Sequence, residues 1–132
     1  MLRLAREVHQ QLLGHARSAL PAEAVGLLGG VGGAVTVAIG LPNLAGLGAF
    51  SADPRAQFLA ERRLAATGLE LLAIYHSHPG GGAMLSARDQ QFAQPWQVIQ
   101  VVVAVARPFG RADEVRAFRP GSPPMEVPLL VT

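Results

Sequence analysis

The stretch from Ala73 to Asp89 reads Ala-Ile-Tyr-His-Ser-His-Pro-Gly-Gly-Gly-Ala-Met-Leu-Ser-Ala-Arg-Asp. It begins inside an apolar run, residues 69–75, which is typical of a buried strand. Side chains alternate along a strand, so His76 and His78 point to the same face at the end of that strand. Two imidazoles and the Asp89 carboxylate are a ligand set of catalytic zinc sites, which leave one position for water. The sequence therefore predicts a metal site at the end of a strand.

Ser86 and Asp89 have two interpretations. A serine followed three residues later by an acid is also a capping box, in which the two side chains satisfy backbone groups at a helix start. Taken alone, the pair favours capping. The pair occurs together with His76-Ser77-His78-Pro79 after a buried strand, and this combination favours a metal site. The same helix start can serve both purposes.

Composition indicates one domain, residues 1–132, with a sizeable core. Half of the 132 residues are apolar and 15% are charged, which is unlike a disordered chain. The chain has no cysteine. This excludes disulfides, a thiolate nucleophile and zinc sites that use cysteine, including those of the zinc deaminases.

Charge and hydropathy exclude two further classes of protein. All 11 basic residues are arginines, they are scattered, and the net charge is only +2, so no nucleic-acid partner is expected. Residues 24–52 carry no charge, but their glycines and a proline indicate turns between short strands. We therefore expect no membrane span. The N-terminus lacks the apolar core of a signal peptide, and a cytoplasmic location is expected.

The periodicity predicts an α/β domain with a mixed, partly curled sheet and two to three helices. In the second helix the apolar stripe is imperfect, because Arg62 falls among Phe58, Leu59 and Ala66. The apolar residues 129–131 fit either a strand at a homodimer interface or a strand in the core, so both oligomeric states stay open. The predicted helices are residues 5–20, 55–67 and 86–93, and the predicted strands are 24–30, 34–39, 69–75, 98–106, 114–118 and 126–131.

These residues carry a family resemblance. The run His76-Ser77-His78-Pro79 with Ser86 and Asp89 resembles the JAMM motif of MPN (Mov34) domain metalloproteases. The segment Pro21-Ala22-Glu23-Ala24-Val25-Gly26-Leu27-Leu28-Gly29 resembles the family's upstream glutamate segment. Asn43 and residues 50–54 look like its loop before the second helix. The resemblance covers roughly residues 5–106 and implies a cytidine-deaminase-like fold.

The resemblance also implies roles for five residues. His76, His78 and Asp89 would bind Zn²⁺, with water as the fourth ligand. Glu23 would act as general base on that water and then as general acid to the leaving amine. Ser86 would donate a hydrogen bond to the oxyanion. Without the family, Glu23 reads as an exposed acid before a strand.

The implied activity is hydrolysis of a peptide or isopeptide bond after the C-terminal Gly-Gly of a ubiquitin-like protein. The loop between Pro79 and Ser86 is short, so the chain looks like the compact prokaryotic type. The substrates of that type are ubiquitin-like sulfur-carrier proteins or their conjugates. Two alternatives stay open: a RadC-like metal protein associated with DNA, and a non-catalytic MPN scaffold. The diffuse basic charge disfavours the first, and the complete set of five residues disfavours the second.

Overall fold

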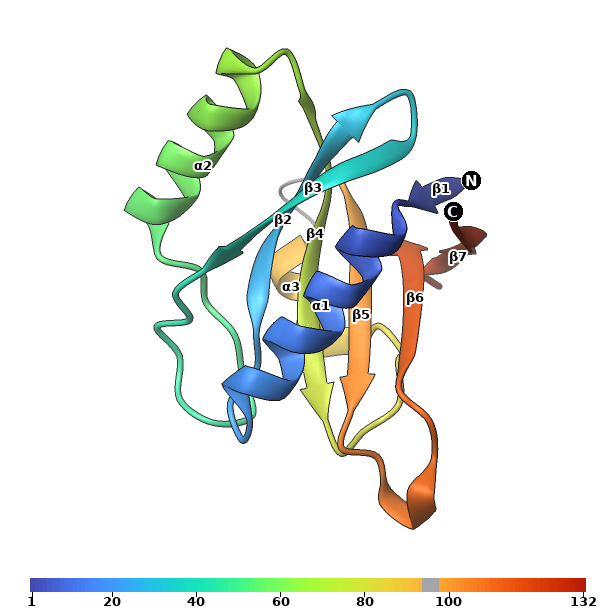
Figure 1. Cartoon of the computed structure of the whole chain (residues 1–132). Helices are drawn as coiled ribbons and strands as arrows, with labels where there is room; N and C mark the ends of the chain where they lie inside the picture. Colours follow the sequence, from blue (N-terminus) through green and yellow to red (C-terminus); the bar gives the residue numbers. More distant parts are fainter. Residues whose placement is uncertain (94–97) are drawn as a thin grey trace.

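The computed structural model describes residues 1–93 and 98–132, which form an eight-stranded mixed sheet with helices on both faces (Figure 1). The strand order is β7-β6-β5-β4-β2-β3-β1-β8. The predicted fold class is confirmed. Within these described residues, no helix is both long enough and apolar enough to cross a membrane. The strands are β1 Leu2–Leu4, β2 Val25–Val31, β3 Ala34–Leu41, β4 Glu70–Pro79, β5 Ile99–Val105, β6 Glu114–Arg119, β7 Met125–Val127 and β8 Leu129–Val131.

The central strand is β4, which carries both histidines. It pairs antiparallel with β2 and parallel with β5. A parallel pair needs a crossover connection, and this crossover contains α3, Ala87–Ala93. The strand extends to Pro79, four residues beyond its predicted end, so His76 and His78 belong to the strand itself. The crossover after β4 therefore returns Asp89 toward the two histidines.

One face of the sheet is covered by α1, Arg6–Ala19. Val8, Leu12 and Ala16 are its buried residues, and they join a core cluster with side chains of β1, β4 and β5. Their spacing of four places them on a single side of the helix. In Figure 1, α1 crosses in front of the sheet and α3 lies behind it. The core thus lies on both sides of β4.

The helix α2, Pro54–Ala66, begins where the sequence predicts, but a different face is buried. Asp53 caps it by accepting a hydrogen bond from the backbone N–H of Arg55 at 3.0 Å. Its buried residues are Ala60 and Leu64, whereas Phe58 and Leu59 are more than half exposed. Leu64 packs against Gly29 of β2, where an added Cβ would lie 2.4 Å from the leucine. The absence of a side chain at Gly29 makes room for Leu64, so the buried face of α2 runs through Ala60 and Leu64. Phe58 and Leu59, which belong to the apolar stripe read from the sequence, are therefore left exposed.

The two ends of the sheet are joined by a single residue. Residues 126–131 were expected to form one strand, but Pro128 divides them into β7, which pairs with β6, and β8, which pairs with β1. Proline has no N–H to donate and interrupts the ladder, while its carbonyl accepts a hydrogen bond from Leu2 N–H at 2.8 Å. Strand β1 was not predicted. Because β7 and β8 are the outermost strands, this link makes the sheet curl strongly.

A partly buried polar pair lies on the α1 face of β4. The His15 Nδ1 atom is 2.7 Å from the hydroxyl oxygen of Tyr75, and Tyr75 is 2% exposed. The tyrosine ring lies against Gly26, where an added Cβ would come within 2.4 Å of it. His15 packs similarly on Gly40. Gly26 and Gly40, two glycines of the uncharged residues 24–52, thus make room for this pair.

Candidate metal centre

The register between β2 and β4 brings Glu23 to the histidines. Val25 pairs with His76 in this antiparallel ladder, so continuing the register places Glu23 opposite His78. Ser77, which is fully buried, fastens the segment: its N–H donates to the Ala24 carbonyl at 3.0 Å, and its Oγ accepts from the Ala24 N–H at 2.7 Å. Glu23, 53 residues before His76, therefore enters the site through strand pairing.

His76, His78 and Asp89 converge on one point. The two Nε2 atoms are 3.1 Å apart, and each lies 3.1 Å from Asp89 Oδ2. Two ligand atoms of a tetrahedral zinc site are about 3.3 Å apart for Zn–N bonds of about 2.0–2.1 Å. Glu23 also presents a carboxylate oxygen within 4.8 Å of the histidine ligand atoms. Asp89 makes the shorter contacts, so it suits the ligand position and Glu23 a place beside it.

The tautomer of His78 supports a cation at this point. Its Nδ1 lies 2.9 Å from the Gly82 carbonyl oxygen, which can only accept, so Nδ1 carries the proton. In its neutral form, this tautomer presents a lone pair on Nε2 toward another imidazole nitrogen and a carboxylate oxygen. A single proton satisfies only part of this triangle, whereas a metal ion accepts all three lone pairs. A carbonyl on the far ring nitrogen is also the usual support of a metal-binding histidine.

The capping box is formed, and it holds Asp89. The Ser86 Oγ accepts from the Asp89 N–H at 3.1 Å, and Asp89 Oδ2 accepts from the Ser86 N–H at 3.0 Å. That same Oδ2 faces both histidines. The start of α3 therefore orients the carboxylate toward the metal position, and the two interpretations of the pair are compatible. Ser86 itself is exposed.

Electrostatics separate the two carboxylates. Burial raises the pKa of Glu23, which is only 7% exposed, although the nearby histidines oppose this effect. Burial also tends to raise the pKa of Asp89, but its contacts with His76 and His78 outweigh this and hold the pKa well below its usual range. One carboxylate is thus kept ionised, and the other is shifted toward neutral pH. Such a division is typical of a ligand beside a proton carrier.

A loop before α2 covers the ring of His76. Phe50 stacks on that ring with a centroid distance of 4.2 Å and an interplanar angle of 16°. The His76 ring is fully buried, and its Nδ1 has no hydrogen-bond partner among the residues that the structure describes. The Asn43 Nδ2 donates to the Glu23 carbonyl at 2.9 Å. The segment that resembles the family's loop therefore contacts both sides of the site.

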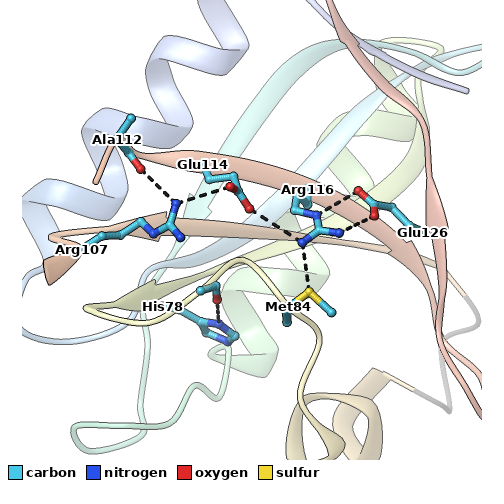
Figure 2. Close-up of polar contacts among 8 residues, drawn as sticks. His78, Met84, Arg107, Ala112, Glu114, Arg116 and Glu126 are labelled. Carbon is cyan, nitrogen blue, oxygen red and sulfur yellow. Dashed lines mark hydrogen bonds and ion pairs between the residues drawn. The ribbon is translucent and has the colours of Figure 1, made fainter. Parts of the chain in front are cut away.

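An ionic ladder on β6, β7 and the segment just after β5 borders the loop between the histidines and α3. The ladder comprises Arg107, Glu114, Arg116 and Glu126, and Figure 2 shows its contacts beside His78. Arg116 also donates to the Met84 sulfur at 3.0 Å. Met84 lies between Ala83 and Leu85, which are buried. The loop that supplies the Gly82 carbonyl is thus held by two apolar anchors and one polar contact.

The comparisons with known proteins agree with this geometry. The profile of the prokaryotic homologues of the JAB domain matches residues 5–120. The chain belongs to this prokaryotic JAB family. The predicted JAMM-type domain is thereby confirmed. A JAB structure from Archaeoglobus fulgidus, described as a JAB1/MPN domain protein, aligns with 99% of this chain and 99% of its own length at a TM-score of 0.69 and 21% identity, which shows the shared fold.

Two further relatives are more similar in sequence. A probable TtuB-protein conjugate cleaving protease of Thermus thermophilus is 41% identical over 120 residues, which cover 89% of this chain and 75% of that protein. The solution structure of a protein from Desulfitobacterium hafniense is 31% identical, with a TM-score of 0.88 over 100% of this chain and 93% of that one. The family and the protease relative support a peptidase or isopeptidase.

The structure thus brings Glu23, His76, His78 and Asp89 together, with Ser86 at the cap of α3. Ser77, Asn43 and Phe50 also contribute to the site, and no site role was predicted for them from the sequence. Ser77 appeared only as the middle residue of the histidine pair. The only sequence indication for Asn43 and Phe50 was their resemblance to the family's loop.

Proposed function

We propose that this protein is a zinc-dependent peptidase of the JAMM type that cleaves after the C-terminal Gly-Gly of a ubiquitin-like sulfur-carrier protein. The observation that carries the proposal is the 3.1 Å triangle of two Nε2 atoms and one carboxylate oxygen, with Glu23 beside it. His76, His78 and Asp89 would hold the metal. Bound zinc supplies Lewis-acid polarisation of a carbonyl and a water of lowered pKa.

The protein's own residues would move the protons and stabilise the charge. Glu23, whose pKa is raised by burial, takes a proton from water and returns it to the leaving amine. Ser86 has a hydroxyl hydrogen left to donate, because its oxygen accepts from the Asp89 N–H. That hydrogen is available to the developing oxyanion. His78 is kept in one tautomer by the Gly82 carbonyl.

The substrate assignment rests on the Thermus relative, which is named for cleavage of TtuB-protein conjugates. A Gly-Gly tail has no side chains, so it suits a site in which one histidine ring is already covered by Phe50.

The decisive experiment uses a ubiquitin-like protein with a short extension after its Gly-Gly. Incubation with the purified enzyme should release the extension, as measured by mass spectrometry, and a chelator should stop the release. Metal analysis should find about one zinc per chain. Added zinc should restore the chelated enzyme. A fully folded enzyme that binds zinc and releases no extension from any such substrate would contradict the proposal.

A matched pair of variants tests the role of Glu23. Glu23→Gln removes a proton carrier without removing a proposed ligand, so zinc content should persist while kcat falls about 10²- to 10⁴-fold. Glu70→Gln makes the same chemical change at an exposed position at the start of β4, and its kcat should stay unchanged. If both variants hydrolyse at the wild-type rate, Glu23 is not the base.

A further inference from the structure

The side-chain amide of Asn43 links the backbone of Glu23 to the loop over the metal position. Its Nδ2 donates to the Glu23 carbonyl at 2.9 Å and to the Ala49 carbonyl at 3.1 Å. Its Oδ1 accepts from the Ala45 N–H at 3.0 Å and from the Ser51 N–H at 2.9 Å. These four bonds use both donors and both acceptor lone pairs of the amide. No other polar side chain of the same size and neutral charge offers this combination.

Two of the four partners flank Phe50. The Ala49 carbonyl and the Ser51 N–H belong to its neighbours on either side, so the amide fixes the backbone on both sides of the ring. That ring stacks on His76. One side chain therefore sets the position of the residue proposed as base and of the ring that covers a proposed metal ligand. The four side-chain hydrogen bonds of Asn43 all go to backbone groups, and none goes to the Glu23 carboxylate or the Phe50 ring.

The loop has other support. Leu44 N–H donates to the Ser51 carbonyl at 2.8 Å, and Asp53 N–H donates to the Pro42 carbonyl at 3.1 Å. An isolated bridge also pairs Asn43 with Ala52. These backbone bonds close the loop without the amide. The bond to Glu23 is different, because it ties this loop to the segment that leads into β2, two residues before Val25.

We propose that Asn43 is a positioning residue that keeps Glu23 and the Phe50–His76 stack in register. The inference rests on the proposed function, in which Glu23 is the base. The reaction needs the base within hydrogen-bond reach of the water. A displacement of about 1 Å at a reacting group can lower a rate about 10²-fold. Asn43 thus acts on the rate through Glu23.

The test substitutes Asn43→Asp, which keeps the size and replaces two N–H donors by an acceptor that faces two carbonyls. We expect kcat for release of the extension to fall about 10- to 100-fold. KM should change by less than about 3-fold, and zinc content should stay near one per chain. An unchanged kcat would overturn the inference.

Two controls separate positioning from a loss of stability. Asp53→Ala removes the cap of α2, ten residues further along, and should lower the melting temperature while kcat stays within about 2-fold of wild type. In a Glu23→Gln background, Asn43→Asp should lower the residual kcat by less than about 2-fold, because its effect passes through Glu23. An equal loss in both backgrounds would overturn the inference, since Asn43 would then act independently of the base.

A measurement without substrate keeps the inference testable if the proposed activity fails. The ring of Phe50 shields the His76 ring protons, and the chain has only 4 histidines whose resonances need assignment. In the Asn43→Asp protein, the His76 ring resonances should move toward their positions in Phe50→Ala, and they should not move in Asp53→Ala. Unmoved resonances in Asn43→Asp would overturn the positioning role whatever the enzyme hydrolyses.

Discussion

At the scale of single residues, the site depends on side chains that perform no chemistry. Ser77 lies between the two histidines, yet its partner is Ala24, beside Glu23. Asn43 bonds to the Glu23 carbonyl from the other side. The peptide group that joins Glu23 to Ala24 is therefore held by two side chains, Asn43 at its carbonyl and Ser77 at its N–H. These two bonds fix the backbone from which the Glu23 side chain extends.

The Ser77 contact should be visible in stability. Ser77→Ala leaves the buried Ala24 N–H without its acceptor, and an unsatisfied buried donor costs about 1–3 kcal/mol. We expect urea unfolding to show a loss of that size. Ser18→Ala removes an exposed hydroxyl that bonds to the His15 carbonyl and should change stability by less than about 0.5 kcal/mol. Equal losses in the two variants would contradict a special role for Ser77.

His15 should make stability depend on pH. Burial lowers its pKa below 6.5, so the unfolded chain binds this proton more readily than the folded protein. Its stabilising contribution is therefore fully present above pH 6.5 and is lost as the pH falls below that value. The stability of wild type relative to His15→Gln should be greater at pH 7.5 than at pH 5.5, as measured by urea unfolding. A difference that is constant with pH would contradict this assignment.

The sequence predicted the functional groups of the site better than it predicted their supports. His76, His78, Ser86 and Asp89 lie within 14 residues of chain, so spacing and alternation were enough to predict that they lie close together. Asn43 bonds only to backbone groups in the described contacts, among them the carbonyl of Glu23, 20 residues before it. Every residue has a backbone carbonyl, so no sequence pattern indicates which carbonyl a side chain will contact.

At the scale of elements, the first turn of α3 serves both the fold and the site. The reciprocal bonds of Ser86 and Asp89 start the helix, and they direct Asp89 Oδ2 to the histidines. Under the proposed mechanism, a change at Ser86 would therefore alter two properties, the stability of the cap and the rate of the reaction. Substitutions that alter these two properties to different extents can distinguish them.

Ser86→Ala and Ser86→Gly form such a pair. Alanine at an N-cap costs about 0.5–2 kcal/mol, whereas glycine costs only a few tenths. Both lack the hydroxyl, so both should lower kcat by a similar factor, about 10²-fold if Ser86 donates to the oxyanion. Unfolding and hydrolysis assays on the two variants distinguish a capping role of Ser86 from a role in the reaction. A rate loss that follows the stability loss would leave Ser86 with a capping role only.

Elements made by long-range pairing were the least predictable. Strand β1 has three residues, and its partners β3 and β8 lie far along the chain. Its residues Leu2-Arg3-Leu4 carry too little periodicity to be identified. The buried face of α2 was likewise decided by Gly29 of β2. By contrast, the caps and turns of α1, α2 and α3 are local, and their limits were predicted within two residues.

At the scale of the whole molecule, the closing of the sheet depends on β8. Deletion of residues 129–132 removes the partner of β1, including the Thr132 N–H bond to the Leu4 carbonyl at 2.8 Å. It also uncovers Leu2 and Leu4, which are at most 1% exposed. We expect a loss of about 2–4 kcal/mol in urea unfolding, from about 1 kcal/mol per hydrogen bond and the exposed leucines.

A control for this deletion keeps the strand and changes only its surface. Leu130 is 50% exposed, so Leu130→Lys should alter stability by less than about 0.5 kcal/mol. If the deletion costs no more than this substitution, the β1–β8 pairing contributes little to the fold.

The parallel pairing of β1 and β8 also determines how the molecule resists mechanical force. The first strand is entered from residue 1 and the last strand leads to residue 132, and the two run side by side in the same direction. Tension between these two points would pull the strands along their length in opposite directions. Their hydrogen bonds lie across that direction, so they would be loaded together in shear and would not open one after another. An unfolding machine that pulls from one end against a held opposite end would meet its first resistance at this pair.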